Sequence, residues 1–454
     1  MSLFGWFGPS CPVGFREKAW VETRLRWLGE QFGTERLTHG KIIVPTEECF
    51  PDGWDETPEA ARRLLDWVCR YMEVPLSQIS LQVQSAETTA GTFVPHEPGV
   101  VCVADTQLAD PVALAARFAR RLARRMLVER KLLEGDPDRE LVTDLMTVLF
   151  DLGILTANAT VSEKHQRLGR WSSWSVGRQS YLPSRVTAYA MALHAWLRGD
   201  ENPTWGGHLR RDAAEALDQG LRYLIQTKDS LLRRDNVRSR SRNLSVHELL
   251  DRLKQGSTSA RAAALWELAR GDLATAESVQ AVTHGLADRQ AGLRAEAART
   301  LAAWGSAAET AIPHLGEALG DSDEEVRMAS AYALGKLRQQ PDVVVPELID
   351  RLNDPETIDT VAWALAQFGS AAQLVLPQLL ARLKDELGRG DGSIDYLAYA
   401  VRAIAPDAEA EIERLIESCD SELQPQAREL LPESGPIPDP PGGNGLWFWA
   451  DLSS

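Results

Sequence analysis

The chain has 454 residues, of which 44% are hydrophobic and 25% are charged, and its formal net charge at pH 7 is −16. This length suffices for two or three globular domains, and charged residues interrupt every hydrophobic run before it reaches the roughly 18 residues of a membrane span. The acidity argues against nucleic-acid binding by the whole chain, and five cysteines without C-x-x-C spacing, in the absence of a secretory signal, predict a reduced, cytoplasmic protein.

Residues 1–228 are predicted to form an α+β domain in which a small sheet is accompanied by several helices. Apolar residues recur with helical spacing in six segments and with strand-like composition in three. We expect helices at about 15–32, 57–72, 110–134, 138–157, 183–198 and 209–227, short strands at 41–46, 79–85 and 99–106, and a Trp-, Ser- and Gly-rich loop at 169–180. The chain as a whole is predicted to be predominantly helical.

The helix expected at 110–134 carries a stripe of arginines. On a helical wheel one sector holds Arg117, Arg120, Arg121, Arg124 and Arg125, and apolar residues cover the opposite side. The next helix presents two carboxylates one turn apart, at Glu140 and Asp144. Three interpretations stay open: a solvated face, structural pairing of Arg120 and Arg124 with these carboxylates, or a groove that binds an anion.

The segment "FARRLARRMLVERKLLEGDPDRELVTDLMTVLFDLGILTAN" (118–158) resembles a zincin-like metallopeptidase domain. In that register Arg120, Arg121 and Arg124 occupy the His, Glu and His positions of H-E-x-x-H, and Glu140 and Asp144 lie on the partner helix. H-E-x-x-H occurs nowhere in the chain, and a guanidinium has no lone pair to offer zinc. The resemblance therefore implies an inactive domain, with no catalytic residue, metal or cofactor.

Residues 229–243 are predicted to be a linker rich in arginine. The segment "LLRRDNVRSRSRNLS" (231–245) contains five arginines, and the loop at 169–180 contributes Trp171 and Trp174. Basic and stacking side chains together are typical of nucleic-acid binding. A nucleic-acid-associated protein that uses the arginine stripe and this linker is therefore an alternative function.

Residues 244–431 contain an internal repeat of two antiparallel helices, A and B. The step along the chain from each helix-B anchor to the next helix-A anchor is constant, whereas the step from A to B varies between units. The helix-A anchors are Leu253, Leu286, Leu319, Leu352 and Leu383, and the helix-B anchors are Leu268, Leu301, Leu334, Leu365 and Val401. A fixed B-to-A connection sets the stacking of neighbouring units, so we expect an all-α solenoid of five to six helix pairs.

The repeat resembles HEAT repeats of the short bacterial type. The sequences "LRAEAARTLAAWG" (293–305) and "VRMASAYALGKLR" (326–338) match the helix-B pattern V-R-x-x-A-x-x-A-L-G. Pro313, Pro346 and Pro377 are expected to open successive A helices as first-turn prolines. Ile358 and Ile394 replace the helix-B arginine in the last two units, so an Asp–Arg ladder between units should be incomplete.

One position of helix B lies about 160° from the apolar face and is expected to be exposed on the concave side. It is occupied by Trp266, Arg299, Tyr332, Trp363 and Tyr399, which we call the inner row. Exposed aromatic side chains on consecutive inner helices are typical of a protein-binding surface. The alternative is that these side chains lie over adjacent helices and complete the packing.

Residues 432–454 combine a Pro/Gly linker with the aromatic tail residues Trp447, Phe448 and Trp449, which dock either on this chain or on a partner. Together these features predict a non-catalytic protein-binding or scaffolding protein, whose partner binds the solenoid and which does not enter a membrane. A hydrolase with an unrecognised site is the alternative from the enzyme class. The sequence does not predict the oligomeric state.

Overall fold

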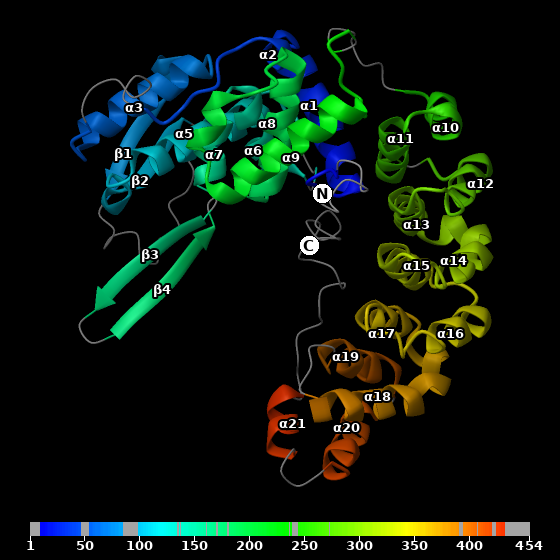
Figure 1. The fold of residues 1–454 in the computed structure, drawn as a ribbon. Helices are drawn as coiled ribbons and strands as arrows, with labels where there is room; N and C mark the ends of the chain where they lie inside the picture. Colours follow the sequence, from blue (N-terminus) through cyan, green and yellow to red (C-terminus); the bar gives the residue numbers. More distant parts are fainter. Residues whose placement is uncertain are drawn as a thin grey trace, which may run out of the picture. The chain divides into compact units, whose positions relative to one another are not determined.

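The structure, a computed structural model, separates the chain into two compact units, Met1–Arg242 and Asn243–Ser454 (Figure 1). It describes residues 10–46, 54–84, 99–133, 136, 138–159, 161–168, 171–178, 181–235, 237, 244–271, 273–389, 394–405, 407–419 and 424–431. In the described part of the chain, no helix is both long and apolar enough to cross a membrane.

The N-terminal unit is mainly helical. Its helices are α1 (Phe15–Phe32), α2 (Glu35–Thr38), α3 (Pro58–Tyr71), α5 (Pro111–Glu129), α6 (Arg139–Leu149), α7 (Gly153–Asn158), α8 (Ser184–Arg198) and α9 (Arg211–Thr227). Local sequence fixes where several of them begin. The Thr57 hydroxyl accepts a hydrogen bond from the Ala60 N–H and caps α3, while the Asp110 carboxylate accepts one from the Ala113 N–H and caps α5. Each of these caps is followed by a proline in the first turn.

Two of the three predicted strands form a small parallel sheet. Strand β1 (Ser80–Gln84) pairs with β2 (Val100–Ala104), with Leu81 opposite Val101. The predicted strand at 41–46 is wrong, because this segment runs without a strand partner. Ile43 is buried there, and its N–H donates to the Asp151 carbonyl at 2.9 Å, so an apolar run packs against a loop instead of a sheet.

The predicted loop at 169–180 is wrong for most of its length. Residues Trp171–Arg178 form strand β4, which pairs antiparallel with β3 (Val161–Leu168), with His165 opposite Trp174. Two antiparallel strands satisfy each other's backbone hydrogen bonds, so they need no long run of apolar residues in the sequence. This explains why composition alone predicted a loop.

Part of the predicted linker belongs to the N-terminal unit. Leu232 and Val237 are buried, and the Leu231 N–H donates to Glu22 of α1 at 2.7 Å. The Arg234 guanidinium donates to the Leu197 carbonyl at 2.6 Å. The chain therefore continues to pack on α1 and α8 beyond α9, where the sequence predicted an arginine-rich linker.

The C-terminal unit stacks helix pairs in two layers (Figure 1). The A helices are α10 (Val246–Gln255), α12 (Ala276–Gly285), α14 (Ile312–Ala318), α16 (Pro341–Ile349), α18 (Leu376–Arg389) and α20 (Ala408–Glu417). The B helices are α11 (Thr258–Arg270), α13 (Ala291–Trp304), α15 (Glu324–Leu337), α17 (Ile358–Ala366) and α19 (Ile394–Ile404), and α21 (Gln424–Leu430) follows. The B helices pack directly on one another and form the inner layer of the curved stack. This unit is the predicted solenoid.

The prolines of the A helices fit the prediction at two of three positions. Pro313 lies in the first turn of α14, and Pro377 is the second residue of α18. Pro346 instead lies inside α16, which begins at Pro341. Pro341 takes the first-turn position, where a missing N–H costs no hydrogen bond, so the helix starts one turn earlier than the repeat pattern predicted.

An ion-pair ladder connects successive units of the solenoid. Each of its three steps pairs a helix-B arginine with an aspartate that follows the next A helix, as Arg261–Asp288, Arg294–Asp321 and Arg327–Asp354. In the next unit Ile358 stands at the arginine position and is buried, and Asp385, at the corresponding aspartate position, is exposed. The ladder is incomplete, as predicted from the isoleucine replacements.

Candidate functional site

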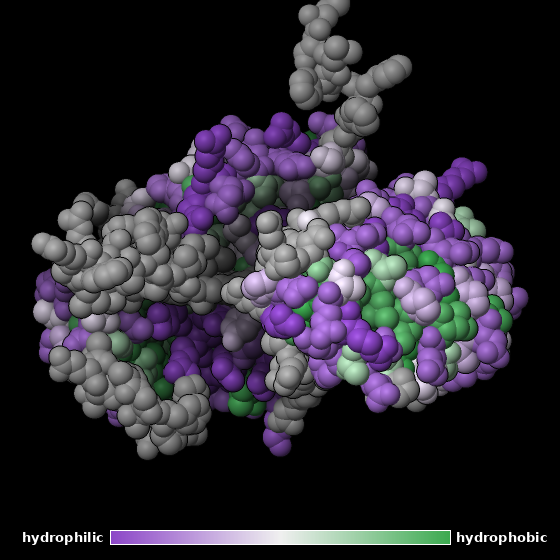
Figure 2. All heavy atoms as spheres, turned by 90° about the horizontal axis from the view of Figure 1, so that it is seen from below, coloured by the Kyte–Doolittle hydropathy of each residue, from purple (hydrophilic) through white to green (hydrophobic). Residues whose placement is uncertain are grey.

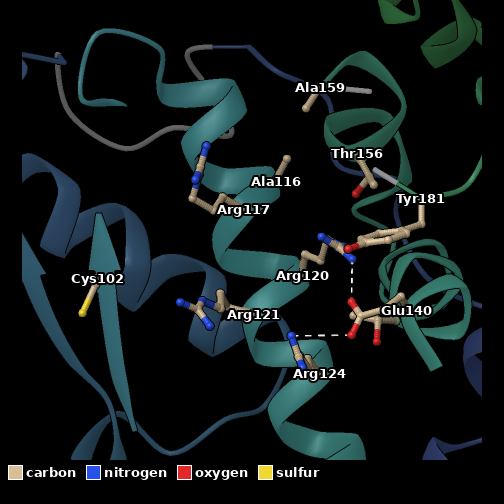
Figure 3. A pocket seen from close by; sticks show the side chains of 11 residues that line it. Cys102, Ala116, Arg117, Arg120, Arg121, Arg124, Glu140, Thr156, Ala159 and Tyr181 are labelled. Atoms are coloured by element: carbon tan, nitrogen blue, oxygen red, sulfur yellow. Dashed lines mark hydrogen bonds and ion pairs between the residues drawn. The ribbon is translucent and has the colours of Figure 1, made fainter. Parts of the chain in front are cut away.

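The N-terminal unit contains an arginine-lined cavity of about 570 Å³ beside α5 (Figure 3). Four of its lining residues are the arginines Arg117, Arg120, Arg121 and Arg124, which α5 presents on successive turns. The other lining residues are Cys102 of β2, Ala116 of α5, Glu140 and Thr143 of α6, Thr156 of α7, Ala159, and Tyr181, which precedes α8. Four of the five arginines of the predicted stripe therefore line one cavity. The fifth, Arg125, donates to the Gln78 carbonyl outside it.

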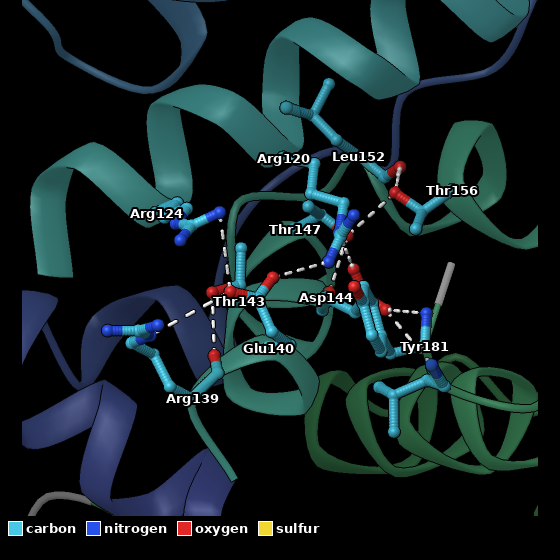
Figure 4. A network of polar contacts seen from close by, with 11 residues as sticks. Arg120, Arg124, Arg139, Glu140, Thr143, Asp144, Thr147, Leu152, Thr156 and Tyr181 are labelled. Atoms are coloured by element: carbon cyan, nitrogen blue, oxygen red, sulfur yellow. Dashed lines mark hydrogen bonds and ion pairs between the residues drawn. The ribbon is translucent and has the colours of Figure 1, made fainter. Parts of the chain in front are cut away.

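Arg120 joins α5 to α6 through two carboxylates (Figure 4). Its Nε donates to Asp144 Oδ1 at 2.5 Å, and its Nη2 donates to Glu140 Oε2 at 2.7 Å. The other Asp144 oxygen accepts hydrogen bonds from the backbone N–H groups of Tyr181 and Leu182, at 2.6 and 3.0 Å. A fully buried carboxylate is thus satisfied by one guanidinium and two amides, and it connects α5, α6 and the start of α8. For Arg120 the contacts therefore agree with the structural-pairing interpretation.

Arg124 makes a weaker contact with the same α6 carboxylate. Its Nη1 lies 3.5 Å from Glu140 Oε1, and 40% of its side chain is exposed. Glu140 also has Arg139 at 3.8 Å, so two arginines share one of its oxygens. The predicted facing of Arg124 and Glu140 is present, but the pair is open to solvent.

Arg117 and Arg121 leave α5 away from Glu140 (Figure 3). They lie one turn apart, and both line the cavity. Partial burial lowers the pKa of Arg117, and the charge of Arg121 lowers it further. Two like charges are therefore held side by side at this end of the cavity.

Tyr181 was not predicted as a site residue. Its ring lies under the Arg120 guanidinium, with 4.6 Å between the guanidinium carbon and the ring centroid, and 45% of the residue is exposed. Asp144 brings Tyr181 to the cavity from 37 positions further along the chain. No local pattern in the sequence links these positions, so the sequence offered no signal for Tyr181, Thr156 or Cys102.

The inner row of the solenoid is packed between helices. The predicted exposure is wrong for Trp266, Arg299, Tyr332 and Trp363, which are 5–6% exposed, and Tyr399 is half-buried. The rings of Tyr332 and Trp363 stack with their centroids 5.0 Å apart. Close B-to-B packing covers side chains that an isolated helix would expose, and this favours the packing alternative. Protein binding by the row itself stays a prediction.

Arg299 takes the place of an aromatic side chain in this row. It donates to Glu296 of its own helix at 2.8 Å and to Glu325 of α15 at 2.7 Å. Burial on its own would lower the pKa of Arg299, but the charges of Glu296 and Glu325 outweigh burial and raise it. The arginine therefore stays charged and connects α13 to α15.

Two cations border the inner row on its exposed side. The Arg270 guanidinium lies 4.7 Å from the Trp266 ring centroid, and the Lys336 ammonium lies 5.9 Å from the Tyr332 centroid. Both residues are exposed. Two rings of the inner row thus each have an exposed cation nearby.

The repeat geometry agrees with a known family. Residues 246–335, 279–359 and 312–390 each match the family model for HEAT repeats. The C-terminal half contains HEAT repeats. The match confirms the predicted HEAT resemblance, lies wholly in the C-terminal unit, and lends no support to the zincin-like resemblance of 118–158.

Several solved structures are similar to this chain. One is from the complex of CpcE and CpcF of phycocyanin lyase from Nostoc sp. PCC7120, with 21% identity, coverage of 42% of this chain and 77% of that chain, and a TM-score of 0.33. An engineered protein is 24% identical over 41% of this chain and 94% of its own, with a TM-score of 0.31. A second engineered protein is 17% identical, with coverage of 91% of this chain and 100% of its own, and has a TM-score of 0.32. No curated protein matches the chain.

Two further features concern the aromatic tail and metal binding. Trp447, Phe448 and Trp449 of the aromatic tail lie outside the described residues. Within the described ranges, no group of three or more His, Cys, Asp and Glu side chains is placed to hold a metal ion. The predicted site residues that the structure describes lie at the arginine-lined cavity and along the B helices of the HEAT solenoid.

Proposed function

We propose that this protein is a non-catalytic scaffold that binds a protein partner on the inner surface of its HEAT solenoid. The observation that carries the proposal is the unbroken inner layer of B helices from α11 to α19, since stacked repeats form one extended surface. Such a surface can contact a partner at many points without the cavity or the cluster of reactive groups that catalysis needs.

The chemistry of the contact follows from which side chains are accessible. The aromatic rings of the inner row are mostly buried, so they support the surface instead of inserting into a partner. Arg270 and Lys336 are exposed above Trp266 and Tyr332, two units apart. We assign them as contact residues, each held over a ring that restricts its motion.

Apolar contacts are available elsewhere on the same unit. Figure 2 shows hydrophobic residues gathered over part of the surface of the C-terminal unit when it is seen from below. Among the described residues, its exposed large hydrophobic side chains include Val343 of α16 and Leu374, which precedes α18. Exposed apolar surface next to polar residues is typical of protein contacts, which also supports a protein partner.

Nucleic-acid binding has less support. Residues 244–431 contain 31 acidic and 17 basic residues, so the solenoid would repel a phosphate backbone over most of its surface. In the N-terminal unit the arginines line a cavity, and Arg120 is neutralised by Asp144 and Glu140. These charges do not form the continuous basic surface that a nucleic acid requires.

The test is co-purification with tagged full-length protein that carries Arg270→Glu and Lys336→Glu. Both residues are exposed, so the change should leave the fold intact, unlike alanine at the buried Trp266 or Trp363. We expect the partners of the wild type to be lost or reduced at least about tenfold, because two contact charges are reversed. Lys254→Glu on α10, in the outer layer, is the matched control and should keep the partner set. An unchanged partner set in the double variant would reject the proposal.

A further inference from the structure

Among its described lining residues, the cavity of the N-terminal unit has more guanidiniums than carboxylates. Its described lining contributes four guanidiniums and one carboxylate, Glu140, and Asp144 lies behind Arg120. Both carboxylates are already engaged: Asp144 by Arg120, and Glu140 by Arg120 and Arg124. Neither carboxylate makes an ion pair with Arg117.

Arg117 is a partly buried cation in the wall of this cavity. It has no hydrogen-bond acceptor and no carboxylate partner among the described residues, although it is only partly exposed. Its neighbour on the next turn of α5 is another arginine, Arg121, and the two charges disfavour each other. Holding a partly desolvated cation beside a second cation costs free energy, and a bound anion would offset that cost.

The rest of the cavity is built for a small ligand. A volume of about 570 Å³ lies within the usual range for small-molecule sites. The Arg120 side chain is fixed by two carboxylates and by the Tyr181 ring, so this wall is ordered before any ligand arrives. The exposed Tyr181 ring adds an apolar surface beside the charged wall.

We propose that this cavity binds the phosphate group of a small molecule, with Arg117 and Arg121 as its ligands. A phosphate group offers three oxygens and close to two negative charges, and guanidiniums bind it through paired N–H donors. The organic part of the ligand would lie toward Tyr181 and Thr156 at the opposite wall. This site is separate from the scaffold function proposed for the solenoid, so either can fail alone.

The test measures the thermal stability of the full-length protein in inorganic phosphate and in succinate at matched ionic strength. A ligand that binds only the folded state raises the melting temperature. We expect phosphate to raise it more than succinate in the wild type and in Arg117→Lys, which keeps the charge. Arg117→Gln should lose the phosphate effect, with affinity for phosphate reduced at least about tenfold by titration calorimetry. Arg211→Gln is the matched control, because Arg211 is exposed on α9 and pairs with Glu215.

Three results would overturn the proposal. The first is no phosphate effect on the wild type, and the second is an equal phosphate effect on Arg117→Gln. The third is a response to succinate that matches or exceeds the response to phosphate. If Arg117→Gln does not fold, as judged by circular dichroism, Arg121→Gln replaces it in the same comparison.

Discussion

Arg120 and Arg124 lie one turn apart on α5 and contact the same carboxylate of α6, yet their surroundings differ. Arg120 is 23% exposed and contacts a carboxylate with no exposed surface, Asp144, which also receives two backbone N–H groups. Arg124 is 40% exposed and reaches only Glu140. A buried carboxylate without its cation is costly, whereas an exposed pair contributes little.

Alanine substitution should therefore separate the two arginines. We expect Arg120→Ala to lower the free energy of unfolding by about 3 kcal/mol, because it leaves the Asp144 carboxylate buried without a cation. Arg124→Ala, its matched control from the same helix face, should cost less than about 0.5 kcal/mol. Denaturant unfolding of the full-length variants measures both changes. Equal losses would mean that the network does not depend on Asp144.

At the residue scale, the helical wheel predicted which face of a helix each side chain occupies, but not whether a neighbouring helix buries that side chain. It grouped Arg120 with the other arginines on one face, and pairing with Glu140 and Asp144 was one of three open interpretations, which the contacts of Arg120 favour. It wrongly predicted an exposed Trp363, because the wheel describes one helix and the preceding B helix, α15, packs against this ring. Burial in a solenoid depends on the distance between repeats, which no single helix encodes.

At the element scale, the ion-pair ladder connects the repeat units through Arg–Asp pairs, and the pKa values of two of its aspartates are shifted. Burial on its own would raise the pKa of Asp321, but the hydrogen bonds from Arg294 and the backbone, together with the Arg294 charge, outweigh burial and lower it. Asp354 behaves in the same way beside Arg327. A carboxylate whose folded pKa is lowered contributes stability above its unfolded pKa of about 3.9, and this stability is lost as the pH falls through the folded pKa.

The ladder should therefore contribute to the acid sensitivity of the solenoid. At pH 7 we expect Asp321→Asn to lower the free energy of unfolding by roughly 1 kcal/mol, because Arg294 loses a charged partner. The difference from the wild type should shrink as the pH falls below about 4, where the wild-type carboxylate also becomes protonated. Asp385→Asn is the control, since the buried Ile358 stands where the ladder would place an arginine. Denaturant unfolding at several pH values tests this, and a difference that persists at low pH would contradict it.

Elements with a repeated or capped sequence were predictable, and elements defined by distant partners were not. The helix pairs of the solenoid recur in register, and the caps at Thr57 and Asp110 fix helix starts locally. The wrongly predicted strand at 41–46 and the missed strand β4 depend on whether a partner strand lies alongside. Strand pairing is a non-local property, so composition alone could not decide either case.

At the scale of the whole molecule, the chain consists of two units with different charge and construction. Residues 244–431 account for most of the net negative charge, and their core is shared between successive repeats. The N-terminal unit extends past α9, because Leu232 is buried and Leu231 donates to Glu22. The sequence placed the end of this domain at 228, where the helical pattern ends and arginines begin.

Two N-terminal fragments, 1–228 and 1–242, test this boundary. Fragment 1–242 keeps the buried Leu232 and Val237 and the hydrogen bond to Glu22, so we expect one cooperative unfolding transition. Fragment 1–228 loses these contacts and leaves the buried Glu22 carboxylate with one donor fewer. Loss of a single buried leucine side chain costs about 2–5 kcal/mol, so the shorter fragment should be less stable by at least about 2 kcal/mol. Leu232→Ala in the longer fragment should reproduce part of this loss. Equal stability of the two fragments would show that residues 229–237 do not stabilise the N-terminal unit and belong to the linker.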